Sequence, residues 1–593
     1  MRLFLILFSF FIQNHLFSYE QSLTDEATKG KLESARLDEM IEKYLATISM
    51  YDPERATYLG IHDNDYLLTS RDYATQGSLL DAIRFLKKDI ERIDYESLDV
   101  FKRSEYNTLS SMIENDIYGI ENIKRLSLYP QYYLEPFDTV YFMMTKDYAP
   151  YMARAKNALA RLSKIPSILY QAERNITRPP RPWTVYSINR ASYTIVNLGD
   201  YYQVFRNYIG LDPTLKTEFE NIISDLKTAL ERYKRFLEKE VLPRSDGKAY
   251  SGLYTYGFYL ERWHGIDYNP RKAMRVAKRN FMKNYARLVE EAKKIAPDRY
   301  SEGGIAAVYQ FISGDYPEYD NVVKNISDLF EKAKDHFDEY RVIKYPQQRL
   351  LIRTSPVFFT GFYPSFFYIP PFALDKERVG EIYIYLPNEK DKEKQEKILS
   401  SLYSQPKIEL FISSLLIPGL HIRYDYLGGL SKIRKVAYHP ALDGWMDFAI
   451  DLAMDMGYYS SVYAPFLTQY FKTLRALRGY LDVAYHIEEI NWDEAKEKFN
   501  KYFGLNNDMC EYEMLNISMK PSYFFAAVYG YNEIVKLKNK FVGSENRFFD
   551  LREFNSDFLT RGNISFKDIK EELKVIRKER LKKKILEEEE YEE

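Results

Sequence analysis

The stretch DPTLKTEFENIISDLKTALERYKRFL, residues 212–237, indicates most clearly how this chain folds. Asp212 followed by Pro213 is a typical helix start, because an aspartate side chain accepts free N–H groups and proline suits the first helical position. Apolar side chains then recur at spacings of three and four residues: Leu215, Phe219, Ile222, Leu226, Leu230, Tyr233 and Leu237. Such a stripe is the buried face of an amphipathic helix. The stretch therefore predicts one long helix packed on a core.

The same periodicity runs through most of the chain, with further apolar stripes at residues 28–49, 75–95, 270–295 and 322–340. Strand signals are few. The best is EIYIYL at 381–386, an alternating run closed by Pro387, and a second lies near 365–369. These patterns predict a mainly α fold, a large multi-helix body with one small β element. Because no internal repeat or Gly/Ser-rich linker divides the chain, we expect a single helical domain over residues 19–570.

The ends of the chain predict export and a solvated tail. Arg2, an apolar run over residues 3–12 and Ser18 follow the order of a secretory signal peptide. The run is shorter than the roughly 20 apolar residues of a membrane span, and no other stretch is long and apolar enough to span. We expect residues 1–18 to be removed and the protein to be periplasmic or extracellular; the alternative is an uncleaved anchor. Residues 571–593 are a charged run, expected to be a solvated tail.

Composition narrows the possible functions. The formal net charge of −2 gives no basic footprint for nucleic acid. The only cysteine is Cys510, so an exported chain has no internal disulfide and depends on packing. No G-x-S-x-G elbow, P-loop or dinucleotide fingerprint is present. The 54 tyrosines and 37 phenylalanines are assigned mainly to the core, with a peptide- or carbohydrate-binding surface as the alternative. No feature indicates an oligomeric state.

Five short segments carry a more specific pattern. In chain order they are DPERATYLGIHD (52–63), DKERVG (375–380), SLLIPGLH (414–421), DGW (443–445), and EMLNI (513–517) with AVYG (527–530). In order and spacing they resemble the bacterial "domain of unknown function 885" family, over about residues 35 to 570. Members of that family are exported helical proteins similar to gluzincin zinc peptidases. The resemblance implies a metallopeptidase-like body around a central cleft.

The third segment is where the family holds its metal. The family reads H-E-x-x-P-G-H-H, in which histidines bind zinc and the glutamate is the general base. Here the Pro-Gly pair at 418–419 fixes the alignment, and Ser414, Leu415 and Leu420 replace the first His, the Glu and the first His of the final pair. Only His421 remains. A catalytic zinc needs three protein ligands and a nearby base, which these residues do not supply.

Other polar positions of the family are changed as well. Asp443 stands where the resemblance implies a glutamate as third zinc ligand, and it keeps the carboxylate. The family residues that the resemblance implies for orienting substrate are replaced by Asn516 and Ile517 (for Arg and Tyr) and by Ala527 (for Tyr), and a further family His is replaced by Asn555. A later stretch is kept as Arg478, Asp482 and His486. Their spacing of four places them on one helix face, and we interpret them as an internal salt-bridge ladder; a retained substrate contact is the alternative.

We therefore expect a catalytically inactive zinc-peptidase homologue that binds a peptide or protein and needs no cofactor. The strand at 381–386 favours this, because an extended peptide can pair with a strand edge without zinc. One alternative is an active hydrolase with zinc relocated to His421, His439 and Asp443, since two imidazoles and a carboxylate suit zinc. The other is a structural envelope protein without a ligand cleft.

Overall fold

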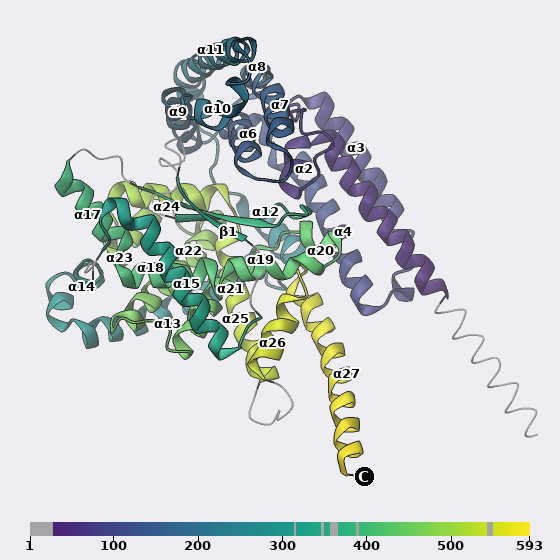
Figure 1. Ribbon diagram of the computed structural model, residues 1–593, viewed down its shortest axis with the longest axis vertical. Helices are drawn as coiled ribbons and strands as arrows, with labels where there is room; N and C mark the ends of the chain where they lie inside the picture. Colours follow the sequence, from purple (N-terminus) through teal and green to yellow (C-terminus); the bar gives the residue numbers. More distant parts are fainter. Residues whose placement is uncertain are drawn as a thin grey trace, which may run out of the picture.

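The computed structural model describes residues 28–312, 316–344, 349–355, 366–386, 391–542 and 550–592. These residues form a mainly helical molecule with one three-stranded sheet (Figure 1), as the sequence predicts. The expected signal segment, residues 1–18, and Pro387 lie outside the described residues. None of the described helices combines the length and apolar character needed to cross a membrane.

The first part of the chain builds a helical lobe, purple to blue in Figure 1. After a helix over residues 28–51 come α2 (Pro53–Leu59), α3 (Tyr73–Ile90), α4 (Val100–Tyr118), α5 (Arg125–Leu128), α6 (Glu135–Thr145), α7 (Tyr151–Leu162), α8 (Ile165–Asn175), α9 (Arg181–Val196), α10 (Asp200–Ile209) and α11 (Pro213–Phe236). The prediction for α11 is confirmed: Asp212 accepts the N–H of Thr214, and the stripe from Phe219 to Tyr233 is buried. Two separate hydrophobic cores stabilise the lobe. One packs the helix over residues 28–51 against α3 and α4. The other packs the helices from α5 through α11 against one another, apart from the first core.

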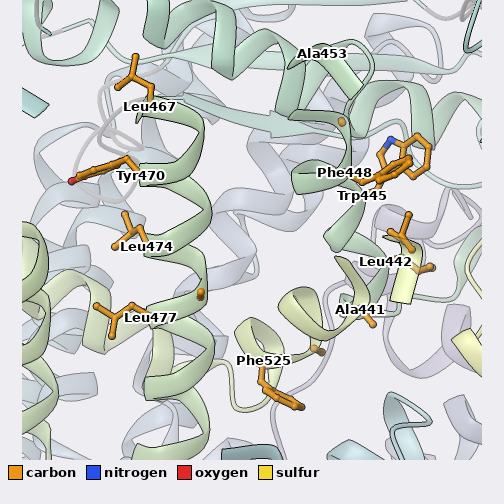
Figure 2. Close-up of a cluster of buried hydrophobic side chains, with 14 of the residues drawn as sticks. Ala441, Leu442, Trp445, Phe448, Ala453, Leu467, Tyr470, Leu474, Leu477 and Phe525 are labelled. Carbon is orange, nitrogen blue, oxygen red and sulfur yellow. The ribbon is translucent and has the colours of Figure 1, made fainter. Parts of the chain in front are cut away.

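The rest of the chain forms a larger helical body. Its helices are α12 (Gly252–Phe258), α13 (Pro270–Ile295), α14 (Pro297–Phe311), α15 (Val322–Tyr340), α17 (Lys392–Tyr403), α18 (Gln405–Phe411), α19 (Leu420–Tyr426), α20 (Lys432–Val436), α21 (Trp445–Asp455), α22 (Ala464–His486), α23 (Trp492–Phe503), α24 (Asn507–Met519), α25 (Tyr523–Phe541), α26 (Leu551–Leu559) and α27 (Phe566–Glu592). Figure 2 shows part of their shared core, with Trp445 on α21, Leu474 on α22 and Phe525 on α25.

The sheet lies between the lobe and the body. Its strands are β1 (Arg349–Thr354), β2 (Phe366–Ile369) and β3 (Val379–Ile384), in the order β1-β3-β2, with β1 parallel and β2 antiparallel to β3. Because side chains alternate across a strand, Ile382 and Ile384 belong to the core of the body, whereas Tyr383 packs with Tyr141 and Phe142 of α6. Both edges of β3 are occupied, so the strand predicted at 381–386 has no free edge for a peptide.

The C-terminal helix is only partly a solvated tail. Helix α27 begins at Phe566, and Ile569 and Leu573 in its first two turns are fully buried. The carboxylate of Glu572 is also buried and accepts hydrogen bonds from Arg434 (2.6 Å) and Arg561 (3.0 Å). The packed domain therefore continues past the predicted boundary at residue 570, because these side chains complete the core beside α20 and α26.

Candidate functional site

The segments that resemble the metal site meet at the centre of the body, as their alignment predicts. Ser414, Leu416, Ile417 and His421 are buried. Residues Ile412–Leu416 form a π-helical turn between α18 and α19. The indole N–H of Trp445 donates to the carbonyl of Pro418 (2.9 Å), which joins the third segment to the fourth.

Two glycines bring the fourth and fifth segments together. A Cβ atom on Gly444 would lie 2.1 Å from the backbone nitrogen of Tyr531, and one on Gly530 would lie 1.6 Å from the carbonyl oxygen of Ala441. Any side chain at either position would force the turn Pro440–Gly444 and α25 apart. Gly444 and Gly530 are therefore packing positions that allow the two segments to approach closely.

An arginine side chain contacts Ser414, the position at which the family resemblance implies a metal-binding histidine. Arg475 of α22 donates to the Ser414 hydroxyl (3.1 Å) and forms an ion pair with Asp447 of α21. Burial raises the pKa of Asp447, and the charge of Arg475 opposes this rise. Leu415 and Leu420 are half-buried in the same region. A guanidinium beside Ser414 repels a metal cation, so this donor set does not fit zinc.

The relocated set of His421, His439 and Asp443 is not assembled either. The imidazole of His421 lies 3.0 Å from the hydroxyl of Tyr368. Asp443 accepts hydrogen bonds from Arg423 (3.3 Å) and from the hydroxyls of Tyr438 (2.9 Å) and Tyr523 (3.0 Å). Among the residues that the structure describes, no three or more His, Cys, Asp and Glu side chains lie close enough to hold one metal ion.

His439 lies beside a different cavity. It lines a hollow of about 500 Å³ together with Trp263 and Asp568. Burial lowers the pKa of His439 to about 4, and the repulsion of Arg423 adds to this effect, so the imidazole is neutral at pH 7.

Of the predicted ladder of Arg478, Asp482 and His486, the structure shows only a long contact between His486 and Asp482 (3.8 Å). Arg478 makes a two-pronged ion pair with Glu513 of α24 (2.7 and 2.5 Å). Asp482 accepts the backbone N–H groups of Ser522 (2.9 Å) and Phe525 (3.0 Å), at the start of α25.

His486 also has backbone partners. It accepts the N–H of Ser251 (3.0 Å) and lies 2.9 Å from the carbonyl of Ile517, while its separation from Asp482 is 3.8 Å. The three polar side chains thus tie α22 to α24, to the start of α25 and to the segment at Ser251. The prediction considered only contacts along the helix. Partners on other segments compete with the i,i+4 contact and take up most of the hydrogen-bonding groups.

The remaining altered positions are spread out. Ile517 is fully buried, Ala527 is half-buried, and the buried amide of Asn555 donates to the carbonyl of Val342 (3.0 Å). Asn516 lines a cavity of about 960 Å³, here called the central cleft.

The central cleft lies between the lobe and the body. Its walls come from residues 52–190 of the lobe and from residues 259–263, 438 and 512–523 of the body. Eight tyrosines line it: Tyr58, Tyr129, Tyr132, Tyr186, Tyr259, Tyr438, Tyr512 and Tyr523. Tyr438 and Tyr523 close its inner wall, since their hydroxyls bond Asp443. None of Ser414, Leu415, Leu420 and His421 lines the cleft.

Charged residues of the cleft are mostly paired. Ion pairs join Arg71 to Glu54 (2.8 Å), Arg125 to Glu135 (2.7 Å) and Arg190 to Asp138 (2.5 Å). Arg71 and Arg125 also lie over the ring of Tyr132, at 4.4 and 4.0 Å from its centroid. These cleft residues are not apparent from the sequence, because they come from distant segments and none belongs to a catalytic motif.

Comparison with known proteins shows the family to which the chain belongs. The model of a family described as "Bacterial protein of unknown function (DUF885)" matches residues 53–573. The chain belongs to this family. A search of curated proteins gives no match.

Two solved structures share the DUF885 fold of this chain. One is "a putative lipoprotein of unknown function" from Shewanella oneidensis, with a TM-score of 0.71 and 17% sequence identity. The other is "the putative lipoprotein" from Colwellia psychrerythraea, with a TM-score of 0.69 and 14% identity. Each match covers 91% of this chain and 98% of the other. At such low identity the likeness shows the fold alone.

Proposed function

We propose that this DUF885 protein binds an extended peptide, or a segment of a partner protein, in the central cleft without hydrolysing it. The observation that carries the proposal is the contrast between two regions. The central cleft has a volume of about 960 Å³ and a tyrosine-rich wall. The positions aligned with the metal motif lie in packed protein, with Arg475 against Ser414. The open cavity supports binding, and the packed surroundings of Ser414 support the absence of hydrolysis.

The lining of the cleft suits a peptide. Tyrosine offers a large flat surface with only two rotatable bonds, so it contributes contact area with little loss of side-chain entropy. Paired Arg and Glu side chains can exchange partners with backbone amides of a ligand. Binding here does not require pairing with β3, whose edges are both occupied.

The two alternatives fit the geometry less well. A structural protein without a ligand cleft does not account for an open cavity of this size. Hydrolysis with relocated zinc needs His421, His439 and Asp443 to converge, whereas Asp443 bonds Arg423 and two tyrosines. We further propose that the protein is exported, on the basis of the signal-like residues 1–18, which agrees with the description of both structural neighbours as putative lipoproteins.

The test uses random octapeptides and two matched variants. Asn516→Trp places a large ring in the cleft wall, and Asn539→Trp makes the same change on the exposed face of α25. We expect the wild type and Asn539→Trp to retain peptides on a column, and Asn516→Trp to lose most of that retention. Mass spectrometry of the flow-through, with and without added zinc, should show uncleaved peptides. Zinc-dependent cleavage, or equal retention by all three proteins, would overturn the proposal.

A further inference from the structure

One cation of the central cleft has no acidic partner. Five basic residues line the cleft, and four of them are paired: Arg71, Arg125 and Arg190 as described above, and Arg55 with Asp116 (2.8 Å). The fifth, Lys520, forms no ion pair with any residue that the structure describes. Its ammonium group lies 5.8 Å from the ring centroid of Tyr523.

Lys520 is placed by the end of a helix. It is the C-cap residue of α24, directly before Pro521, so its side chain leaves the helix into the cleft rather than along the surface. The residue is exposed, but neighbouring protein partly desolvates its ammonium group. This surrounding protein lowers the pKa of Lys520, and the charge of Arg478 lowers it further.

The buried Asp443 does not pair with this lysine. Asp443 influences Lys520 electrostatically, but its two carboxylate oxygens already accept hydrogen bonds from Arg423, Tyr438 and Tyr523. The two tyrosines lie between Asp443 and the open cleft. The remaining acids of the lining are also engaged: Glu54, Glu135 and Asp138 in ion pairs, and Asp52 as the cap of α2. Lys520 is therefore the basic residue of the lining that has no ion-pair partner among the described residues.

We propose that the central cleft binds a ligand through a carboxylate, which pairs with the ammonium group of Lys520. This inference rests on the proposed peptide-binding function and names the group of the peptide that is recognised. A single ammonium matches the single charge of a carboxylate, whereas phosphate recognition favours several donors or a free guanidinium. A partly desolvated lysine also gains more from a charged partner than an exposed one does. The free C-terminus of a peptide supplies such a carboxylate beside side chains that can stack on tyrosine.

The experiment compares two octapeptide libraries of the same random sequences, one with free C-terminal carboxylates and one amidated. Four proteins are used: the wild type, Lys520→Met, Lys520→Arg and Lys501→Met. The last is the matched control, because Lys501 also lies over a tyrosine ring, at 5.7 Å from the centroid of Tyr502, but does not line the cleft. Melting curves establish that each variant is folded. A second measurement needs no mutation: an N-acetyl amino acid, or its amide, is added to compete with the peptides for binding to the wild type.

We expect the wild type, Lys520→Arg and Lys501→Met to retain the free-acid library about ten-fold more than the amidated one, the size of effect that one charged hydrogen bond gives. Lys520→Met should lose this preference. If amidated peptides rich in Asp and Glu are retained and Lys520→Met releases them, the carboxylate comes from side chains and the proposal still holds. Equal retention of both libraries, unchanged in Lys520→Met, would overturn the role of Lys520 and leave peptide binding intact. Retention of neither library would overturn the proposed function, and this inference with it.

Discussion

The imidazole of His62 lies 2.8 Å from the carboxylate of Asp375, which joins residues 313 positions apart in the chain. Its other ring nitrogen lies 2.9 Å from Asp65, and the ring stacks on Tyr148 with 3.8 Å between centroids. The first two family segments, 52–63 and 375–380, therefore meet directly. Burial alone would lower the pKa of His62, but hydrogen bonds to Asp375 and Asp65 raise it to about 9.

The stability of the protein should therefore fall on the alkaline side. Because the folded-state pKa of His62 is above the unfolded value of about 6.5, its contribution is complete below pH 6.5 and is lost as the pH rises through about 9. We expect His62→Gln to lower the free energy of unfolding by about 2 kcal/mol at pH 6 and by much less at pH 10. Urea unfolding between pH 6 and pH 10 measures this difference.

His336 supplies the control for this prediction. Its ring contacts the carbonyl of Met456 (3.1 Å) rather than two carboxylates, so His336→Gln removes an imidazole without breaking a carboxylate contact. An identical slope in the wild type and His62→Gln would contradict the prediction.

A second prediction concerns the start of α27. Glu572→Gln should destabilise the protein by about 3 kcal/mol, because it leaves Arg434 and Arg561 beside a buried neutral group. Removal of residues 585–593 should change stability by less than about 0.5 kcal/mol, since Ile585 and Leu586 are exposed. Thermal unfolding of both variants locates the end of the packed domain. Equal effects of the two changes would favour the boundary at residue 570.

The sequence predicts those parts of the fold that local patterns determine. The helices α11, α13 and α15 match their predicted stripes within a residue or two, because capping residues and a 3.6-residue period lie within each segment. Strand β2 matches the strand predicted near 365–369 closely. Strand β3 begins two residues before the predicted run at 381–386. Strand β1 is not predicted by the sequence. Its sequence, Arg349–Thr354, has a short apolar centre without alternation, which periodicity cannot assign to a strand or a helix.

Local sequence patterns predict less of the candidate functional site than of the fold. The burial of Ser414 and His421 follows from the Pro-Gly alignment, since it fixes which residues face the centre. The hydrogen bond of Arg475 to Ser414 and the position of Lys520 in the cleft depend on which segments meet in three dimensions. No spacing along the chain encodes these contacts. The tyrosines of the cleft are likewise indistinguishable in sequence from those of the core.

A third prediction concerns Ser522, which precedes α25 with φ +71°. Its hydroxyl lies 2.8 Å from the buried Nε2 of His264. Ser522→Ala loses this hydrogen bond and keeps the strained backbone, at a cost of about 2 kcal/mol. Ser522→Gly loses the same bond but relieves about 1 kcal/mol of strain, so the glycine variant should melt at the higher temperature.

The same pair of changes at Ser78, within α3, is the control for this comparison. Glycine is less favourable than alanine by about 1 kcal/mol inside a helix, so the order of melting temperatures should reverse there. If alanine is also better at position 522, the left-handed backbone costs less than this argument requires.

The last prediction concerns repair of the metal motif. The sequence alone suggests that Ser414→His, Leu415→Glu, Leu420→His and Asp443→Glu together should restore zinc uptake. In the structure, however, the guanidinium of Arg423 lies 3.3 Å from Asp443, and that of Arg475 contacts Ser414. A zinc ion between these positions would face two cations, the buried Arg423 and the half-buried Arg475. We therefore expect the fourfold variant to show no zinc-dependent rise in melting temperature.

Adding Arg423→Met and Arg475→Met removes both charges, and zinc should then stabilise the sixfold variant by about 3 kcal/mol at a hundred times its Kd, a shift of a few degrees for a chain of this size. The protein with only the two arginine changes is the control, and zinc should not affect it. Metal analysis after dialysis checks the stoichiometry. A zinc-induced shift in the fourfold variant would mean that the two arginines move aside, and that the lost ligands alone separate this chain from a metal-binding relative. No shift in the sixfold variant would mean that the packing of α19 and α21, rather than charge, excludes the ion.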